Sequence, residues 1–451
     1  MAVYINNHDY QFTMIIKDVE VKGFWGRTKA VASFFTDVTI FIGLNGTGKT
    51  TFINLISAVL TVDLFQLSSL QFEEIIINLV EPNGKSRRKI TVTNSQEESS
   101  AFNAYNVYEY KVGTKTYTVS LTPDARLKRP MPEREMFVRF LSPEVRRQYL
   151  ALKQEISSLV EISQISVYRQ VSSESFEADP RQRTTAVDER LQQLFERFSR
   201  YQLKLETQLN ERSTLFQQEA LGSLLYNEEF DEFNSQKLEE VSEDDLETQE
   251  DKLSKAFKEL GIEGKSEQIT RHIDKLKDAI KGLKASTETN SVSVADVFAL
   301  PLIYRTNKII DSLNKSEEDK RRIVEPRQRF FDTLQSFMTN KKFQYDNKKS
   351  ALFFSLEGVS SNSLPWSSLS SGEKQLLIQF MEVILQEGRS LIFIADEPEL
   401  SLHVAWQEKL LKALRDLNEN AQLIVATHSP DIVAGFSTNV IDMEKVIAAN
   451  V

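Results

Sequence analysis

The sequence predicts an α/β protein in which a parallel sheet and a lobe of antiparallel strands form one domain, interrupted by a helical insertion. Three observations support this fold class. After residue 350, apolar segments alternate with helical segments, which is typical of a parallel sheet covered on both faces. Short apolar runs separated by turn signals fill the first 145 residues. A heptad pattern between these two regions begins at Val187.

The first region, residues 1–145, is expected to hold strands and one helix. Apolar residues recur at helical spacing over Thr50–Val62, so this segment is predicted as a helix. The turn signals Pro82-Asn83-Gly84 and Pro123-Asp124 separate the later strands. The strands are expected at Phe12–Ile16, Val19–Phe24, Val38–Ile42, Ile75–Val80, Lys89–Thr93, Tyr105–Val112 and Thr116–Leu121.

The middle region, residues 146–345, is predicted to form an inserted helical arm. No proline occurs between Pro180 and Pro301, and glycine is sparse there. The polar stretch Thr287–Val294 is predicted as a loop. The seam is too short for a very long coiled coil, so we expect an antiparallel hairpin with extra helices. Apolar residues with alternating spacings of four and three form the seam: Val187, Leu191, Leu194, Phe198, Tyr201 and Leu205.

The third region, residues 346–451, is predicted to complete the domain that the first region begins. The first strand of the parallel sheet lies before the arm and the later strands lie after it, so the arm is inserted within one domain. Strands are expected at Ala351–Leu356, Ser390–Ala395 and Leu423–Ala426, and helices at Glu373–Glu387 and Ala405–Asn418.

Composition excludes several classes of protein. The chain has no Cys, which excludes disulfides and thiolate metal sites, and its four His residues form no metal-ligand spacing. No apolar run approaches the roughly 20 residues of a membrane span, and the N-terminus is too polar for a secretory signal. We therefore expect a cytoplasmic protein without a membrane segment. The net charge of −10 disfavours a protein that coats nucleic acid along its whole surface.

A glycine-rich loop, GLNGTGKT at Gly43–Thr50, lies between a predicted strand and a predicted helix. It matches the phosphate-binding pattern G-x-x-x-x-G-K-[ST], in which backbone N–H groups and a helix N-terminus face phosphate oxygens. Lys49 is expected to reach the β- and γ-phosphates, and Thr50 to bind Mg²⁺. The alternative is a glycine-rich turn that binds nothing. The residues expected to contact the nucleotide are Asn45, Gly46, Thr47, Gly48, Lys49, Thr50 and Thr51.

Two further motifs follow apolar strands near the C-terminus. Asp396 and Glu397 end one strand, where a carboxylate pair is costly unless it meets a cation and water. Asp396 is expected to hold Mg²⁺, and Glu397 to polarise an attacking water. The alternative is an exposed acidic turn, which the glycine-rich loop disfavours. His428 follows the next strand, in a position to contact the terminal phosphate.

A third motif, Ser370-Ser371-Gly372-Glu373, precedes a predicted helix. A serine hydroxyl, a glycine N–H and a helix N-terminus form an anion site. Considered alone, these residues indicate a helix cap.

The four motifs together resemble the ATP-binding-cassette superfamily, in the branch that contains SMC and RecF proteins and overcoming-lysogenization-defect ATPases. Leu369–Glu373 is similar to the signature loop of that branch, Glu399–His403 looks like its D-loop, and His428 like its switch histidine. The resemblance covers roughly residues 1–145 and 345–445.

This resemblance implies that ATP and Mg²⁺ are held between two subunits, so that the chain forms a head-to-head dimer or a higher homo-oligomer. One subunit would supply Lys49, Thr50, Asp396, Glu397 and His428, and the other would supply Ser370, Ser371 and Gly372.

Two assignments stay open. Arg27 lies where this branch contacts the nucleotide, or it is a surface arginine. The glutamine expected near the magnesium is Gln71, Gln148 or Gln170.

The size of the arm and the ending DEPELSLH…ATHSPDIV are similar to ATPase subunits of the two-gene anti-phage systems PARIS and Septu. This resemblance implies a separately encoded effector nuclease, because the chain is expected to hold no nuclease centre of its own. It also implies a trigger made by the phage. The alternative is a genome-maintenance ATPase similar to RecF and SMC proteins that clamps DNA. A transporter ATPase is disfavoured, since transport cassettes lack such an insertion.

Two charged segments bear on partners. Glu228–Asp251 holds twelve acidic residues against one lysine, which indicates a solvated helix face or a docking surface for a basic partner. Lys85–Lys89, with Arg126, Lys128 and Arg129, is either an edge strand protected by charge or a surface that contacts DNA or an acidic protein. Direct DNA binding is thus an option, though not the favoured one.

Overall fold

The chain divides into two compact units. Unit 1 comprises Met1–Ser199 together with Arg329–Val451, and unit 2 comprises Arg200–Gln328. The chain therefore leaves unit 1 and returns to it, as an insertion requires. The computed structural model describes residues 14–99, 102–120, 142–166, 186–226, 244–289, 294–346, 351–356 and 364–449.

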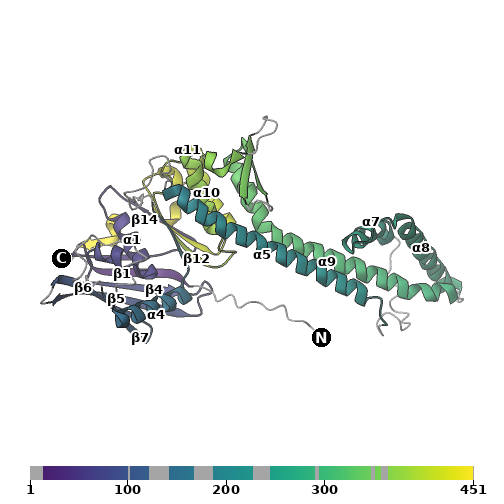
Figure 1. Cartoon of the computed structure of the whole chain (residues 1–451), viewed down its shortest axis with the longest axis horizontal. Helices are drawn as coiled ribbons and strands as arrows, with labels where there is room; N and C mark the ends of the chain where they lie inside the picture. The colour runs from purple at the N-terminus through teal and green to yellow at the C-terminus, as the bar shows by residue number, and fades with distance from the viewer. Residues whose placement is uncertain are drawn as a thin grey trace. The chain divides into compact units, whose positions relative to one another are not determined.

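A five-stranded parallel sheet lies at the centre of unit 1 (Figure 1). Every residue of its two neighbouring strands β12 and β13 is buried, as expected for a sheet covered on both faces. The register places Asp396 beside Ala426, so the carboxyl ends of these strands meet at one edge. The strand order is β14 (Val440–Asp442), β3 (Val38–Ile42), β13 (Ala421–Ala426), β12 (Leu391–Asp396) and β8 (Ile162–Ser166).

A seven-stranded antiparallel sheet forms the second layer of unit 1. Residues of β4 alternate between buried and half-buried, so one face of this sheet contributes to the core. The strand order is β15 (Ile447–Ala449), β2 (Thr28–Ser33), β1 (Ile15–Phe24), β4 (Glu74–Val80), β5 (Arg87–Ser99), β6 (Phe102–Val112) and β7 (Lys115–Ser120).

The basic segment Lys85–Lys89 leads into an internal strand. β5 pairs with β4 on one side and with β6 on the other. The interpretation as an edge strand is therefore wrong for β5 as a whole, although Arg87–Lys89 pair in register only with β4 and the pairing with β6 begins at Ile90. Arg126, Lys128 and Arg129 lie outside the described residues.

Helix α1 (Lys49–Thr61) connects the two sheets. It packs against β8, β12 and β13 and also against α4 (Pro143–Leu159). A single hydrophobic cluster contains Val19 of β1, Phe52 of α1 and Ile394 of β12. The glycine-rich loop, which precedes α1, is therefore fixed to a core that includes both sheets.

Unit 1 contains further helices and strands. α10 (Ser371–Ile384) and α11 (Val404–Leu417) lie near β12 (Figure 1). A small antiparallel sheet contains β9 (Lys341–Asp346), β10 (Ala351–Leu356) and β11 (Leu364–Pro365). The other helices are α2 (Leu64–Ser68), α12 (Pro430–Val433) and α13 (Met443–Val446).

Unit 2 is helical and contains α7 (Asp244–Glu259) and α8 (Ser266–Thr289). It also contains parts of the long helices α5 (Ala186–Gly222) and α9 (Val294–Phe337), which extend into it from unit 1. One cluster joins Leu253, Ile273 and Ile303, and a second joins Phe216, Ala256 and Leu313. Buried apolar contacts between helices thus hold the insertion together.

Two predicted segments lie partly outside the described residues. The acidic stretch Glu228–Asp251 is described only from Asp244, where α7 begins. Of the predicted loop Thr287–Val294, residues 290–293 lie outside the description, and α8 continues to Thr289.

The predicted fold class is confirmed: a parallel sheet, an antiparallel lobe and a helical insertion are all present. Unit 2 spans Arg200–Gln328, which is a shorter stretch of the chain than the predicted arm of residues 146–345. α4 and β8 belong to unit 1, because β8 pairs in parallel with β12. The strand β2 at Thr28–Ser33 is absent from the strands expected from the sequence. Within the described part of the chain, no helix combines the length and apolar character needed to cross a membrane.

Candidate active site

The glycine-rich loop curls between β3 and α1 with three glycines in positive-φ conformations. These are Gly43 at 148°, Gly46 at 82° and Gly48 at 89°. A Cβ added at Gly46 would meet no atom within 4 Å, whereas one at Gly48 would lie 2.7 Å from the Trp25 ring. The loop thus needs glycine for its backbone, and Gly46 faces open space where a phosphate fits.

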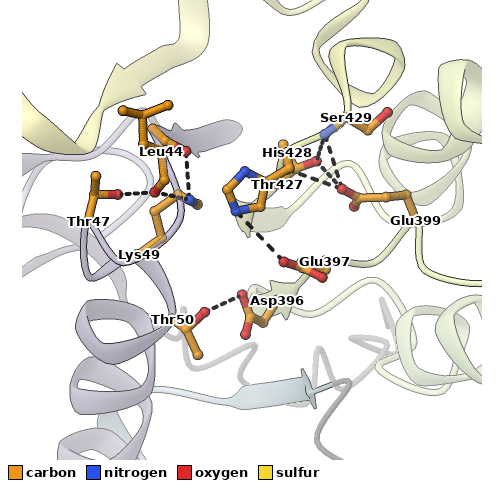
Figure 2. Close-up of polar contacts among 11 residues, drawn as sticks. Leu44, Thr47, Lys49, Thr50, Asp396, Glu397, Glu399, Thr427, His428 and Ser429 are labelled. Atoms are coloured by element: carbon orange, nitrogen blue, oxygen red, sulfur yellow. Dashed lines mark hydrogen bonds and ion pairs between the residues drawn. The ribbon is translucent and has the colours of Figure 1, made fainter.

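Lys49, the first residue of α1, is buried and bends back over the loop. Its Nζ donates to the carbonyl oxygens of Gly43 at 2.8 Å and Leu44 at 3.2 Å (Figure 2). Burial lowers the pKa of the Lys49 ammonium, while the carboxylates of Glu397 and Asp396 act in the opposite direction. A phosphate in the loop would give this ammonium an anionic partner, so the cradle suits a nucleotide.

Thr50 and Asp396 form the part of the site that suits a cation. The Thr50 hydroxyl donates to Asp396 Oδ1 at 3.1 Å. Asp396 is only 6% exposed, and its burial raises the pKa of its carboxyl. A buried carboxylate beside a hydroxyl is the oxygen donor set that Mg²⁺ prefers, and the ion would supply the opposing charge that burial makes necessary.

Glu397 and His428 face each other beside Asp396 (Figure 2). His428 Nε2 lies 3.8 Å from Glu397 Oε1, and both side chains remain more than one-third exposed. Glu397 has a left-handed φ of 48°, and its N–H donates to the Ala426 carbonyl at 2.8 Å. A positive φ is uncommon for a residue other than glycine and is often associated with functional sites. The conformation leaves the carboxylate accessible to a water molecule.

Glu399 joins the loop after β12 to the loop that carries His428. It is 9% exposed, and its Oε1 accepts from the Thr427 hydroxyl and from the N–H groups of His428 and Ser429, each N–H at 3.3 Å. Its Oε2 is buried and has no hydrogen-bond partner among the described residues. One carboxylate oxygen therefore fixes the backbone beneath His428, a role that the sequence analysis did not assign.

Glu399→Ala is expected to lower ATP hydrolysis about tenfold, while the dissociation constant for ATP changes less than threefold. The substitution leaves the buried Thr427 hydroxyl and two partly buried N–H groups without the Glu399 acceptor, which loosens the loop of His428 rather than the phosphate cradle. Glu399→Gln retains an oxygen at the Oε1 position and should restore most of the rate. Steady-state rates and calorimetric titration with an ATP analogue would measure both effects. Equal losses in the two variants would contradict the assignment.

The Ser370–Glu373 segment starts α10. The Ser370 hydroxyl accepts from Glu373 N–H at 3.4 Å, and Ser370 N–H donates to Glu373 Oε2 at 2.9 Å, a reciprocal capping box. Ser370 and Ser371 are exposed, whereas Gly372 is buried. A Cβ on Gly372 would lie 2.4 Å from the Ser401 carbonyl oxygen, so only glycine fits there.

These signature residues make no described hydrogen bond or ion pair to the glycine loop, Asp396 or His428. Lys49, Thr50, Asp396, Glu397 and His428 do come together, as Figure 2 shows. Asn45 is exposed, and Thr47 and Thr51 are half-buried. The Thr47 hydroxyl donates to the Leu44 carbonyl at 2.8 Å, which stabilises the curl of the loop.

The remaining predicted residues lie at different places. Arg27 is in the exposed turn between β1 and β2, close along the chain to Trp25. Gln71 lies beside that turn, where its carbonyl accepts from Trp25 N–H at 3.1 Å, and Gln148 is on α4. Gln170 lies outside the described residues, although β8, which precedes it, ends beside Asp396.

Residues 14–433 match the protein family described as AAA ATPase domain. The chain belongs to this family. Membership in the AAA ATPase domain family makes it an ATPase and implies that it binds a nucleotide, which confirms the predicted enzyme class.

Three solved structures of Smc heads resemble the chain at low identity. One, from Pyrococcus furiosus, is an Smc head domain with an extended coiled coil bound to the C-terminal domain of ScpA. It is 14% identical over 97% of this chain and 96% of that chain, with a TM-score of 0.40. Another, from Pyrococcus yayanosii, is a head domain with a coiled coil and joint, 15% identical over 95% of each chain, with a TM-score of 0.38. An SmcHead bound to the C-winged helix domain of ScpA is 12% identical over 95% of this chain and 94% of that chain, with a TM-score of 0.37. The family assignment does not depend on these structures.

Proposed function

We propose that this ATPase binds and hydrolyses ATP with Mg²⁺ as the controlling subunit of a bacterial anti-phage complex. In this role it binds a separately encoded effector nuclease and releases it when a phage product is sensed. One observation supports the proposed ATP hydrolysis most strongly: five side chains with the required chemistry lie close together at one edge of the parallel sheet. They are Lys49, Thr50, Asp396, Glu397 and His428.

Each of these side chains has a distinct task in the proposed reaction. Lys49 binds the β- and γ-phosphates, and Thr50 and Asp396 would hold Mg²⁺, which would supply positive charge to the phosphate oxygens. Glu397 orients a water molecule and accepts its proton as the water attacks the terminal phosphorus. The bond from that phosphorus to the bridging oxygen breaks, and ADP leaves with that oxygen. His428 contacts the terminal phosphate, and its Nε2 lies 3.8 Å from Glu397 Oε1.

We infer further that two copies of the chain close the site head to head. Exposed Ser370 and Ser371 at the N-terminus of α10 are suited to bind a phosphate. They make no described polar contact with the glycine loop of their own chain. A second copy would bring its serines to that loop, so that ATP binding closes the dimer and hydrolysis reopens it.

Three features of the sequence fit the defence role. The segment DEPELSLH…ATHSPDIV resembles the ATPase subunits of PARIS and Septu, and the neighbouring gene would separate these two systems. The net charge of −10 favours a protein partner over duplex DNA. The chain contains no Cys, which suits the reducing cytoplasm where such a complex would operate.

Affinity purification from the native host tests this proposal. Tagged Glu397→Gln protein with ATP and Mg²⁺ is expected to retain a nuclease encoded by the adjacent gene in stoichiometric amount. Lys49→Ala, purified alongside as the control, should differ in nuclease retention and should fail to protect cells against phage. Duplex DNA without a nuclease would instead favour the genome-maintenance ATPase, which the basic segment Lys85–Lys89 would suit.

A further inference from the structure

A lysine that belongs to none of the sequence motifs forms an ion pair with the signature segment. Lys341 is the first residue of β9, and its Nζ lies 2.6 Å from Oε1 of Glu373, in the first turn of α10. Both side chains are only 13% exposed. The ammonium also lies 5.7 Å from the centre of the Phe354 ring on β10, within the range of a cation–π contact. Lys341 therefore has a defined position beside the start of α10.

The carboxylate of Glu373 connects this lysine to the serine of the signature segment. One oxygen, Oε1, accepts from Lys341, and the other, Oε2, accepts from Ser370 N–H at 2.9 Å. Burial alone would raise the pKa of Glu373, but the ammonium of Lys341 and the Ser370 N–H hold it below its usual value. Glu373 is therefore ionised at neutral pH, and a donor holds each of its two oxygens.

The same arrangement leaves Ser370 able to donate a hydrogen bond. The side chain is exposed, and its hydroxyl oxygen accepts from Glu373 N–H at 3.4 Å. Within the described part of the chain, this hydroxyl donates to no acceptor. A phosphate oxygen is a suitable acceptor, and the N-terminus of α10 favours its negative charge.

The charge of Glu373 opposes phosphate binding at this serine unless a cation balances it. Its Oε2 is hydrogen-bonded to the Ser370 backbone, so a phosphate at the serine would have a carboxylate close by. Two negative groups at short range repel each other, and the repulsion grows where water is excluded. The one ion pair that the structure describes for Glu373 is the pair with Lys341. The lysine therefore offsets this repulsion.

We propose that Lys341 is a positioning residue for the signature serine in ATP hydrolysis. Its ammonium orients the Glu373 carboxylate and balances its charge, so that the Ser370 hydroxyl donates to a phosphate oxygen of the nucleotide bound by a second copy. Lys341 acts through Glu373 and does not itself contact the nucleotide. This inference rests on the proposed function, in which two copies close the site head to head.

Removal of the ammonium tests this role. In Lys341→Met we expect the hydrolysis rate at saturating ATP to fall about tenfold, because the unpaired carboxylate opposes the phosphate at the serine. The affinity of the dilute protein for a slowly hydrolysed ATP analogue should stay within about twofold of the parent, since the glycine loop is unchanged. Lys341→Arg retains the charge and should hydrolyse ATP within about threefold of the parent rate.

Two further variants separate the positioning role from general stability. Glutamine also completes a capping box but carries no charge, so adding Glu373→Gln to Lys341→Met should recover most of the rate. Lys374→Met is the matched control, because Lys374 Nζ pairs with Asp188 Oδ1 at 2.8 Å and makes no described contact with Ser370. It should hydrolyse ATP within about threefold of the parent rate. Equal losses in the two Lys→Met variants, or no recovery in the double variant, would overturn the inference.

Mixing experiments assign the lesion to one side of the shared site. Lys341→Met mixed with Lys49→Ala should hydrolyse more ATP than the two proteins do separately, because each mixed dimer has one site with an intact glycine loop and an intact signature segment. Mixing with Ser370→Arg should give no gain, since both lesions affect the signature segment. A protein that has merely lost its fold gains with neither partner, and that result would overturn the inference.

The outcomes keep the inference separate from the proposed function. If Lys341→Met hydrolyses ATP at the parental rate while Lys49→Ala is inactive, the inference is wrong and the proposed function stands. If Lys49→Ala hydrolyses ATP like the parent protein, the phosphates do not lie in the glycine loop, and the proposed function fails together with the inference that rests on it.

Discussion

Glu397→Gln is expected to lower the rate of ATP hydrolysis by about 10²–10⁴-fold while ATP remains bound. Glutamine fills the same volume but cannot accept a proton from the attacking water, and general-base catalysis is typically worth that factor. The hydrogen bonds of Lys49 to the loop and of Thr50 to Asp396 do not involve Glu397, so the proposed binding groups stay in place after the substitution. Single-turnover hydrolysis and equilibrium ATP binding, measured on the same preparation, would separate the two effects.

The local structure offers a control for Glu397→Gln. Glu397 occupies a left-handed backbone conformation, so a loss of activity after substitution has two explanations, chemistry and altered backbone. Glu397→Asn tolerates this conformation but has a shorter side chain, and it should also be inactive while binding ATP. Glu397→Asp keeps a carboxylate and should retain more hydrolysis than either amide. Normal turnover by Glu397→Gln would contradict its assignment as the base.

The motifs and the strands that carry them could be predicted from sequence because each depends on local pattern. The run Val38–Ile42 is apolar except for Thr39 and precedes a glycine loop, so both the strand and the phosphate cradle follow from a few adjacent residues. The expected strand at Ser390–Ala395 matches β12 within one residue at each end. Uniform burial explains this success, since a strand covered on both faces has no polar alternation to obscure it.

β8 shows where local pattern is insufficient. Its sequence, ISQIS, is short, mostly polar and lies between long helical segments, so the sequence places it in the arm. Its partner β12 is more than 200 residues away, and only that pairing places it in unit 1. Gln164 within β8 accepts from the Ser57 hydroxyl at 2.6 Å and donates to Asn54 at 2.8 Å, both on α1. Such long-range polar contacts leave no periodic signal.

Glu399 and Trp25 illustrate a second limit of sequence reasoning. Glu399 was included in a loop motif, but its hydrogen bonds to the loop of His428 depend on β12 and β13 being neighbours. Trp25 belongs to no motif considered from the sequence, and its contact with Gly48 depends on how the two sheets pack around α1. A tryptophan flanked by Gly23 and Gly26, all three with positive φ, was the available signal of an unusual turn.

Mixing two inactive variants is expected to restore hydrolysis if the site is shared between subunits. Lys49→Ala removes the phosphate-binding ammonium, and Ser370→Arg blocks the signature serine with a bulky side chain. Each variant alone should lose at least 10²-fold of the hydrolysis rate, because both of its sites are defective. In a mixed head-to-head dimer, one site combines the intact glycine loop of one subunit with the intact serine of the other. Equal mixing should therefore recover about one quarter of the parental rate, since half of the dimers are mixed and each has one intact site.

The recovered rate distinguishes a shared site from a site within one chain. The geometry favours sharing, because Ser370 pairs with Glu373 of its own helix and makes no described polar contact with its own glycine loop. A mixture of Lys49→Ala with Glu397→Gln is the matched control, since both lesions affect the same half-site and no mixed dimer contains a complete site. Recovery with Ser370→Arg but not with Glu397→Gln would establish the head-to-head arrangement. No recovery in either mixture, despite subunit exchange shown by differently tagged chains, would place the signature serine within its own chain's site or outside any site.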